Sequence, residues 1–175
     1  MIRWSKGFYQ LECSLFLSVN KFFDYRLMKS FFSLITYAGG ATFTISVTLC
    51  IILFTDVPLR DYGFASLLAL LISHIPVQLL KKIYPRRRPY IVLSETKVTN
   101  SPLEDHSFPS GHTTAIFAVI TPFVMYSFMD FLLYTVACSV AVSRVILGLH
   151  YPSDIVAGAC IGSLVGYLSV LLLAL

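Results

Sequence analysis

Charged residues are scarce in this chain. Only 13% of its 175 residues are Asp, Glu, Lys or Arg, whereas 57% are hydrophobic, and the mean hydropathy is +0.78. Soluble domains carry about 25% charged residues, and one of this length could not bury so much apolar surface. The composition therefore excludes an ordinary soluble protein and predicts one integral membrane domain over residues 1–175.

Cysteines at metal-binding or redox spacing are also missing. The four cysteines stand apart in apolar stretches, without a CxxC pair: Cys13, Cys50, Cys138 and Cys160. We expect them to pack as small hydrophobic side chains. Neither a disulfide framework nor a zinc site is indicated.

Residues 5–23 lack an uninterrupted apolar run. Glu12, Asn20 and Lys21 break it, so neither a cleavable signal peptide nor a spanning helix is favoured. Apolar residues still recur there at helical spacing: Phe8, Leu11, Leu15, Val19 and Phe22. This pattern predicts a helix lying in the membrane interface, within an N-terminal interfacial segment 1–30.

A continuous basic stripe is absent as well. The net charge is +4, and the positive residues stand in clusters. Nucleic acid is therefore not an expected partner, whereas anionic lipid headgroups are.

Long apolar segments make up most of the chain. Each approaches the roughly 20 residues that cross a bilayer core, where the backbone must be helical. The predicted spans are 31–55, with a break at Gly39-Gly40, then 62–80, 112–129, 131–149 and 153–175. The expected fold is an all-α polytopic transmembrane bundle with five spans, or six if residues 5–23 also cross.

Three polar clusters interrupt these apolar segments. The second span ends before Lys81, the third begins at His112, and the fourth ends near His150. One crossing and its return separate His112 from His150, so all three clusters must share one face of the membrane.

The first cluster is cationic. Six residues separate Lys81 from Arg88, and Arg88 ends a run that begins at Arg86 and Arg87. Two fixed cations suit phosphate oxygens, which arginine binds bidentately. A simple patch for lipid headgroups is the alternative interpretation.

The second cluster, at residues 109–112, opens the third span. Ser110 is a good N-cap, and Gly111 lets the backbone approach a ligand closely. A helix N-terminus with free N–H groups binds anions, although an ordinary capped helix start gives the same pattern.

The third cluster holds an arginine inside an apolar span. Arg144 lies five residues before the predicted end, about 7 Å deep along a helix, and needs an anionic partner there. That partner is either a ligand or an acidic residue of the protein. Asp154, four residues after His150, suits the orientation of an imidazole ring.

Two further histidines carry weaker signals. His74 shares a helical face with Lys81 and either lines the pocket or packs in the interior. His106 is expected in a loop at the pocket mouth. Zinc is disfavoured because three converging cations would repel it.

Taken together, the three clusters resemble the signature of the type 2 phosphatidic acid phosphatase family. The matching stretches are KKIYPRRRP ending in Arg88-Pro89, PSGH at 109–112 and SRVILGLHYPSD at 143–154. The resemblance implies metal-independent hydrolysis of a lipid phosphate, with no cofactor. Candidate substrates are undecaprenyl pyrophosphate, which we favour, phosphatidylglycerophosphate and phosphatidic acid.

The resemblance also implies a role for each site residue. His150 attacks phosphorus to form a phosphohistidine, Asp154 fixes its ring, and His112 protonates the leaving oxygen and then activates water. The expected phosphate-binding groups are Lys81, Arg88, Ser110, Gly111 and Arg144. A non-catalytic lipid binder or transporter, or a phosphatase of soluble esters, is the competing class.

Two arguments disagree about the side of the membrane on which the site lies. Nearly all Lys and Arg fall on the face of the site, and Arg60 stands almost alone opposite. The positive-inside rule then predicts a cytoplasmic site. The family resemblance implies the outer face of the cell membrane, which we take as the expectation. The sequence does not indicate an oligomeric state.

Overall fold

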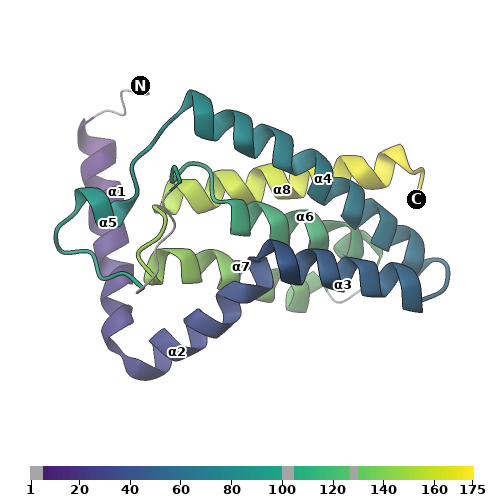
Figure 1. The fold of residues 1–175 in the computed structure, drawn as a ribbon, viewed down its shortest axis with the longest axis horizontal. Coiled ribbons are helices and arrows are strands. Elements are labelled where there is room, and N and C mark those ends of the chain that lie inside the picture. The colour runs from purple at the N-terminus through teal and green to yellow at the C-terminus, as the bar shows by residue number, and fades with distance from the viewer. Residues whose placement is uncertain (1–5, 100–104, 127–129) are drawn as a thin grey trace.

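The computed structural model describes residues 6–99, 105–126 and 130–175, and every regular element in these ranges is a helix. Figure 1 shows long helices side by side and one helix that runs across an end of the bundle. The helices are α1 (Lys6–Asn20), η1 (Lys21–Asp24), α2 (Arg26–Ile35), η2 (Thr36–Gly39), α3 (Ala41–Phe54), α4 (Leu59–Ile83), α5 (Pro89–Val92), α6 (Gly111–Tyr126), α7 (Asp130–Ile146) and α8 (Pro152–Leu172). The predicted all-α class is confirmed.

Helix α1 is the one that crosses the end of the bundle (Figure 1). Its inner side buries Glu12, Phe16 and Asn20, which recur every four residues. Its predicted apolar stripe faces outward instead, with Phe8, Leu11 and Leu15 exposed by 43%, 59% and 49%. This arrangement suits a helix in the membrane interface. Helix α2 begins at Arg26, inside the predicted interfacial segment 1–30.

The first predicted span is bent. Helices α2 and η2 lead into α3 through Gly40, at an angle of 56°. The predicted break at Gly39-Gly40 is thereby confirmed. Gly39 lies so close to α6 and α7 that an added Cβ would stand 2.6 Å from Val140 Cγ1 and 2.9 Å from the His112 carbonyl oxygen.

Helix α6 occupies the centre of the bundle and packs against α3, α4, α7 and α8. Nine of the ten positions from Thr113 to Pro122 are buried, and only Ala115 is less covered. A helix that is apolar on all sides belongs in such a position.

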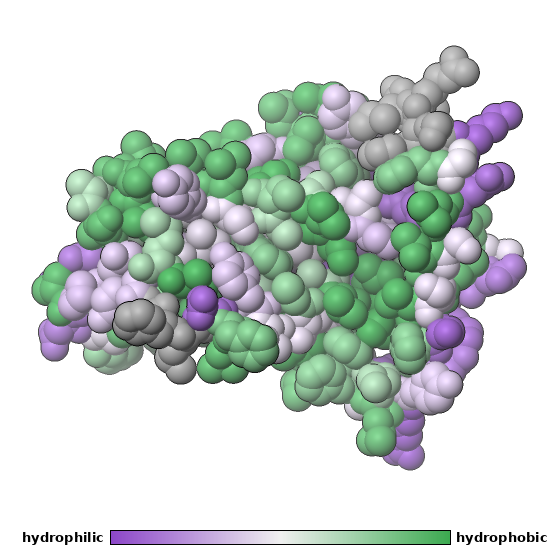
Figure 2. Space-filling model, turned by 180° about the vertical axis from the view of Figure 1, so that it is seen from behind, coloured by the Kyte–Doolittle hydropathy of each residue, from purple (hydrophilic) through white to green (hydrophobic). Residues whose placement is uncertain are grey.

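An apolar surface surrounds the bundle, and hydrophilic side chains gather at its two ends (Figure 2). Helices α4 and α8 are each long and apolar enough to cross a membrane, and the bent pair makes a third candidate among the described residues. Helix α6 is apolar but has only 16 residues. A membrane protein is therefore supported, while the count of five spans stays a prediction. Three of the four cysteines lie on this outer surface: Cys50, Cys138 and Cys160.

Helix α7 ends earlier than predicted. It stops at Ile146 rather than 149, because Gly148 adopts a left-handed conformation with φ 76°. The chain then folds back, and the amides of Leu149 and His150 both donate to the Arg144 carbonyl oxygen. Arg144 therefore lies two residues from the helix end rather than five, underneath the loop that carries His150.

Candidate active site

The three polar clusters meet at the end of the bundle that α1 crosses. Arg88, in the loop after α4, donates from Nη1 to the Leu149 carbonyl oxygen over 2.8 Å. The Ser110 amide, just before α6, donates to the Asp154 carbonyl oxygen over 3.1 Å. These two hydrogen bonds join segments that are more than forty residues apart. The three clusters therefore lie together, as we predicted from their position on one face of the membrane.

His150 and Arg88 are paired inside this site. Both side chains are 1% exposed, and Arg88 Nη1 lies 3.2 Å from His150 Nε2. Because a guanidinium can only donate, Nε2 must offer its lone pair. The ring proton is then on Nδ1, which faces Asp154 Oδ2 at 3.6 Å. The ring is in the tautomer that a nucleophilic Nε2 requires.

The charge state of His150 follows from its burial. Burial favours the neutral ring and, aided by the charges of Arg144 and Arg88, outweighs the stabilisation of the charged ring by Asp154. The pKa of His150 falls to about 4, so the ring is neutral at pH 7. A neutral imidazole can attack an electrophile, whereas an imidazolium cannot.

The Asp154 carboxylate is held on both oxygens. Oδ2 accepts hydrogen bonds from the Tyr151 amide, over 2.8 Å, and from the Ser107 hydroxyl. Oδ1 accepts one from Arg86 Nη1 over 2.9 Å. Asp154 is fully buried in the first turn of α8, where the amide of Tyr151 would otherwise lack a partner. The carboxylate can therefore orient His150 without moving itself.

Arg144 is buried and largely unpaired. Its Nη1 donates to Thr36 Oγ1 over 2.8 Å, and its side chain is 2% exposed. Nε and Nη2 have no hydrogen-bond partner among the described residues. No acidic side chain forms an ion pair with it there, so the alternative of a structural salt bridge is not supported. A buried guanidinium with two unmatched donors is suited to an anion.

His112 stands at the start of α6, beside the bend of the first span. A Cβ added to Gly40 would lie 3.9 Å from His112 Nε2. Ser110 caps the same helix, because its Oγ accepts the Thr113 amide over 3.4 Å. Gly111 borders open space, since an added Cβ would meet nothing within 4 Å. The helix end therefore has room for an anion at its free amides.

Lys81 and Arg88 share a carboxylate from the loop before α6. Lys81 Nζ and Arg88 Nη2 each bind one oxygen of Asp105, and Arg88 Nε donates to its carbonyl oxygen over 2.8 Å. Burial alone would raise the pKa of Asp105, but the hydrogen bonds from these two cations outweigh it and hold the pKa below its usual value. The Asp105 carboxylate is thus paired with Lys81 and Arg88, the two cations that the sequence analysis assigned to phosphate.

The structure distinguishes the three consecutive arginines. Arg88, the arginine that the motif assigns to phosphate, lies beside His150, whereas Arg87 is exposed. Arg86 points the other way and pairs with Glu12 over 2.5 Å and with Asp154 over 2.9 Å. Sequence reasoning missed this residue, because only the structure shows that Glu12 lies on the buried side of its helix.

Other residues differ from expectation or were not foreseen. His74 is exposed on the surface of α4, so it neither lines the site nor packs in the interior; His106 is exposed in its loop, as predicted. Thr36, Asp105 and Ser107 contact the site and carried no signal in the sequence. No group of three potential metal ligands occurs in residues 6–99, 105–126 and 130–175.

The motif geometry agrees with a comparison to known families. A model described as the PAP2 superfamily matches residues 62–174, the greater part of the chain. The chain belongs to the PAP2 superfamily. All three motifs of this PAP2 chain lie inside the matched region, whereas α1 and the bent span precede it.

Individual relatives of the PAP2 chain have related names. It is 28% identical over 113 residues to an undecaprenyl-diphosphatase of Sulfolobus acidocaldarius, covering 63% of this chain and 55% of the relative. It is 32% identical over 108 residues to a lipid A 1-phosphatase of Rhizobium johnstonii, covering 58% and 44%. The chain thus spans about half the length of these curated relatives.

Solved structures share the fold of the PAP2 chain. The crystal structure of Aquifex aeolicus LpxE matches with a TM-score of 0.81 and 26% identity, over 90% of this chain and 93% of that one. A PAP2-type phosphatidylglycerolphosphate phosphatase from Bacillus subtilis matches with a TM-score of 0.78 and 21% identity, over 94% and 85%. The second likeness concerns the fold alone.

Proposed function

We propose that this PAP2 chain is a lipid phosphate phosphatase that hydrolyses a membrane-anchored phosphomonoester or pyrophosphate without a metal ion. The observation that carries the proposal is Arg144, buried with two unmatched donors and close enough for its charge to act on His150. A phosphate with several oxygens can satisfy Arg144 and Arg88 together while its phosphorus faces His150 Nε2.

The proposed reaction has two steps. In the first, the lone pair of His150 Nε2 forms a bond to phosphorus, the bond to the leaving oxygen breaks, and His112 gives that oxygen a proton. In the second, His112 takes a proton from water, whose oxygen displaces His150 and releases inorganic phosphate. Asp154 accepts the Nδ1 proton of His150 as a hydrogen bond throughout, and Lys81, Arg88 and Arg144 stabilise the phosphoryl oxygens.

The proposed substrate is a lipid, with undecaprenyl pyrophosphate favoured. A relative named undecaprenyl-diphosphatase and others named lipid A 1-phosphatase support a lipid-linked phosphate. Phosphatidylglycerophosphate and phosphatidic acid are the alternatives. A non-catalytic binder would need the cations, but it would not need a neutral histidine held by an aspartate.

A covalent intermediate on His150 is the first expected result. Purified protein in EDTA releases phosphate from at least one of these lipids, and brief incubation with 32P-labelled substrate leaves an acid-labile label on His150. The label is absent from His150→Gln protein, and once formed it decays more slowly in His112→Gln protein, because water is no longer activated. Turnover by His150→Gln protein at the wild-type rate would overturn the assignment.

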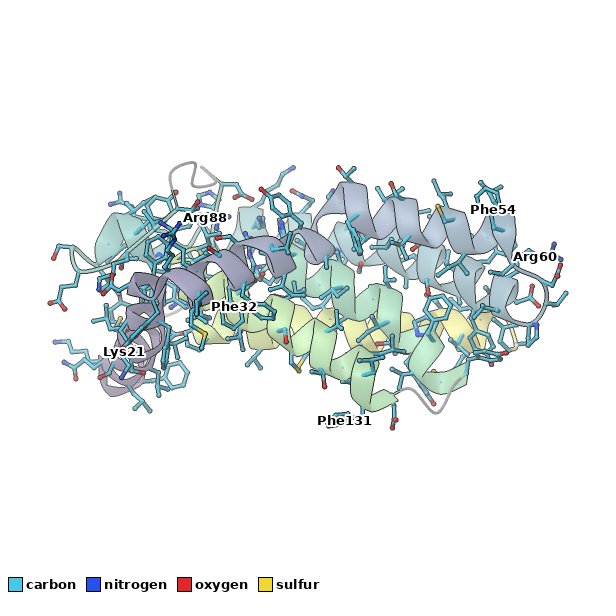
Figure 3. All side chains as sticks on the ribbon, turned by 90° about the horizontal axis from the view of Figure 1, so that it is seen from below. Lys21, Phe32, Phe54, Arg60, Arg88 and Phe131 are labelled. Atoms are coloured by element: carbon cyan, nitrogen blue, oxygen red, sulfur yellow. The ribbon has the colours of Figure 1, made fainter. Side chains whose placement is uncertain are left out.

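We further propose five spans and a site at the outer face of the membrane. Lys21 and Arg88 lie at one end of the bundle and Arg60 at the other, so two loops report the orientation (Figure 3). In protein whose four cysteines are replaced by serine, Ser94→Cys labels with a membrane-impermeant maleimide in intact cells, whereas Asp56→Cys requires permeabilisation. The reverse pattern would place the site in the cytoplasm, as the positive-inside rule predicts.

Removal of the Asp105 charge should strengthen anion binding. Asp105→Asn frees Lys81 and Arg88 from a half-exposed carboxylate, so inorganic phosphate should inhibit at about two- to fivefold lower concentration. Asp24→Asn is the matched control, because it removes a negative charge that is paired with Lys97 instead. An unchanged or weaker inhibition would mean that Asp105 does not compete with phosphate.

A further inference from the structure

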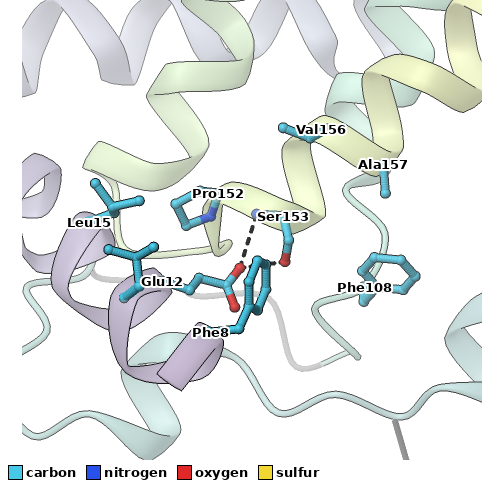
Figure 4. A pocket seen from close by; sticks show the side chains of 9 residues that line it. Phe8, Glu12, Leu15, Phe108, Pro152, Ser153, Val156 and Ala157 are labelled. Atoms are coloured by element: carbon cyan, nitrogen blue, oxygen red, sulfur yellow. Dashed lines mark hydrogen bonds between the residues drawn. The ribbon is translucent and has the colours of Figure 1, made fainter. Parts of the chain in front are cut away.

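Helix α1 reaches the catalytic carboxylate through a chain of buried polar contacts. Glu12 is 3% exposed, although it lies on a helix whose opposite side is apolar and exposed. One of its oxygens accepts hydrogen bonds from the backbone amide of Ser153, over 3.0 Å, and from the Ser153 hydroxyl (Figure 4). Glu12 therefore binds the first turn of α8, the turn that contains Asp154.

The other oxygen of Glu12 binds Arg86. Arg86 Nη2 lies 2.5 Å from Glu12 Oε2, while its Nη1 lies 2.9 Å from Asp154 Oδ1 and 2.8 Å from Ser153 Oγ. Its guanidinium also stacks on Tyr151, with 3.8 Å between Cζ and the ring centroid. Each end of this planar group is fixed, so it can hold Asp154 in one orientation.

Arg86 does not lie where it could bind phosphate. It contacts the Asp154 oxygen that is not directed at His150, since Oδ2 is the atom 3.6 Å from Nδ1. The phosphate side of the ring is Nε2, where Arg88 stands. Arg86 and Arg88 thus lie at opposite ends of the pair formed by His150 and Asp154.

From this geometry we infer that Glu12 and Arg86 are positioning residues for the reaction, which fix Asp154 and through it the ring of His150. The inference rests on the proposed function. It assigns a catalytic contribution to α1, which lies outside the region matched by the PAP2 model. It also explains why a carboxylate is buried on the inner side of an interfacial helix, where an unpaired charge would be costly.

A double-mutant cycle on phosphate release tests the inference. Arg86→Met should lower kcat about ten- to a hundredfold with KM changed less than twofold, because partners behind a catalytic group act at this scale. In an Asp154→Asn background, where the orienting carboxylate is already lost, the same change should cost less than twofold. Arg87→Met is the matched control and should leave kcat unchanged.

The opposite outcomes are equally clear. An equal loss of kcat in both backgrounds would overturn the positioning role, and a raised KM with unchanged kcat would make Arg86 a phosphate ligand instead. If Arg86→Met protein does not fold, Glu12→Gln, which keeps the size of the side chain, runs the same cycle. A wild-type protein without any phosphate release would overturn the proposed function and this role together, whereas an active one with additive losses overturns this role alone.

Discussion

Replacement of Arg144 by alanine is expected to lower kcat/KM for lipid phosphate by about a hundred- to a thousandfold, the scale found when one preorganised donor to developing charge is removed. The reason is that the Arg144 side chain has unsatisfied hydrogen-bond donors when no substrate is bound. Its Nε and Nη2 are buried without a partner among the described residues, so they are free to bind phosphoryl oxygens without first leaving another group. Steady-state phosphate release from purified protein in detergent micelles measures the effect.

Two variants separate charge from geometry at this position. Arg144→Lys keeps the charge but loses the planar fork, so most of the activity should still be lost. Arg87→Ala removes an exposed arginine in the neighbouring loop and should change kcat/KM less than twofold. Full activity in Arg144→Lys protein would mean that a point charge suffices, and full activity in Arg144→Ala protein would contradict the proposed site.

The sequence predicted the residues that would contact phosphate, but it did not predict the residues that hold Asp154 in place. Lys81, Arg88 and His150 belong to motifs with fixed spacing, and counting apolar segments placed the three motifs on one face. Glu12 and Arg86 have no such spacing, because their pairing depends on where α1 docks against α8. That docking is a tertiary event, because Glu12 and Ser153 are 141 residues apart in the sequence.

The ends and bends of the helices could be predicted where a single glycine or proline marks them in the sequence. The first span bends at Gly40, as predicted, and Pro152 opens α8, where the fixed φ of proline suits the first helical position. The end of α7 was predicted wrongly, because apolar residues continue through the turn at Gly148 and hydropathy cannot detect it. Only glycine fits at this turn, because an added Cβ on Gly148 would lie 2.3 Å from the Lys97 carbonyl oxygen.

The largest effect on folding is expected from Gly162→Leu. Gly158, Gly162 and Gly166 form a stripe on α8 that lets it approach α6 closely. A Cβ on Gly162 would stand 2.4 Å from the Thr114 carbonyl oxygen, and backbone atoms cannot yield as a flexible side chain can. The two helices must separate, at a cost of about 3 kcal/mol or more in the free energy of unfolding. A thermal-shift assay in detergent should show a lower Tm and a poorer yield of monodisperse protein.

Activity should fall along with stability, because the same two helices carry the site. Ser110 opens α6, and its amide is bonded to the backbone of Asp154 in the first turn of α8. Cys160→Leu also places a leucine on α8, but on its exposed side, and should leave both Tm and turnover unchanged. If Gly162→Leu protein kept the wild-type Tm and activity, the close contact of α6 and α8 could not be what holds Ser110 beside Asp154.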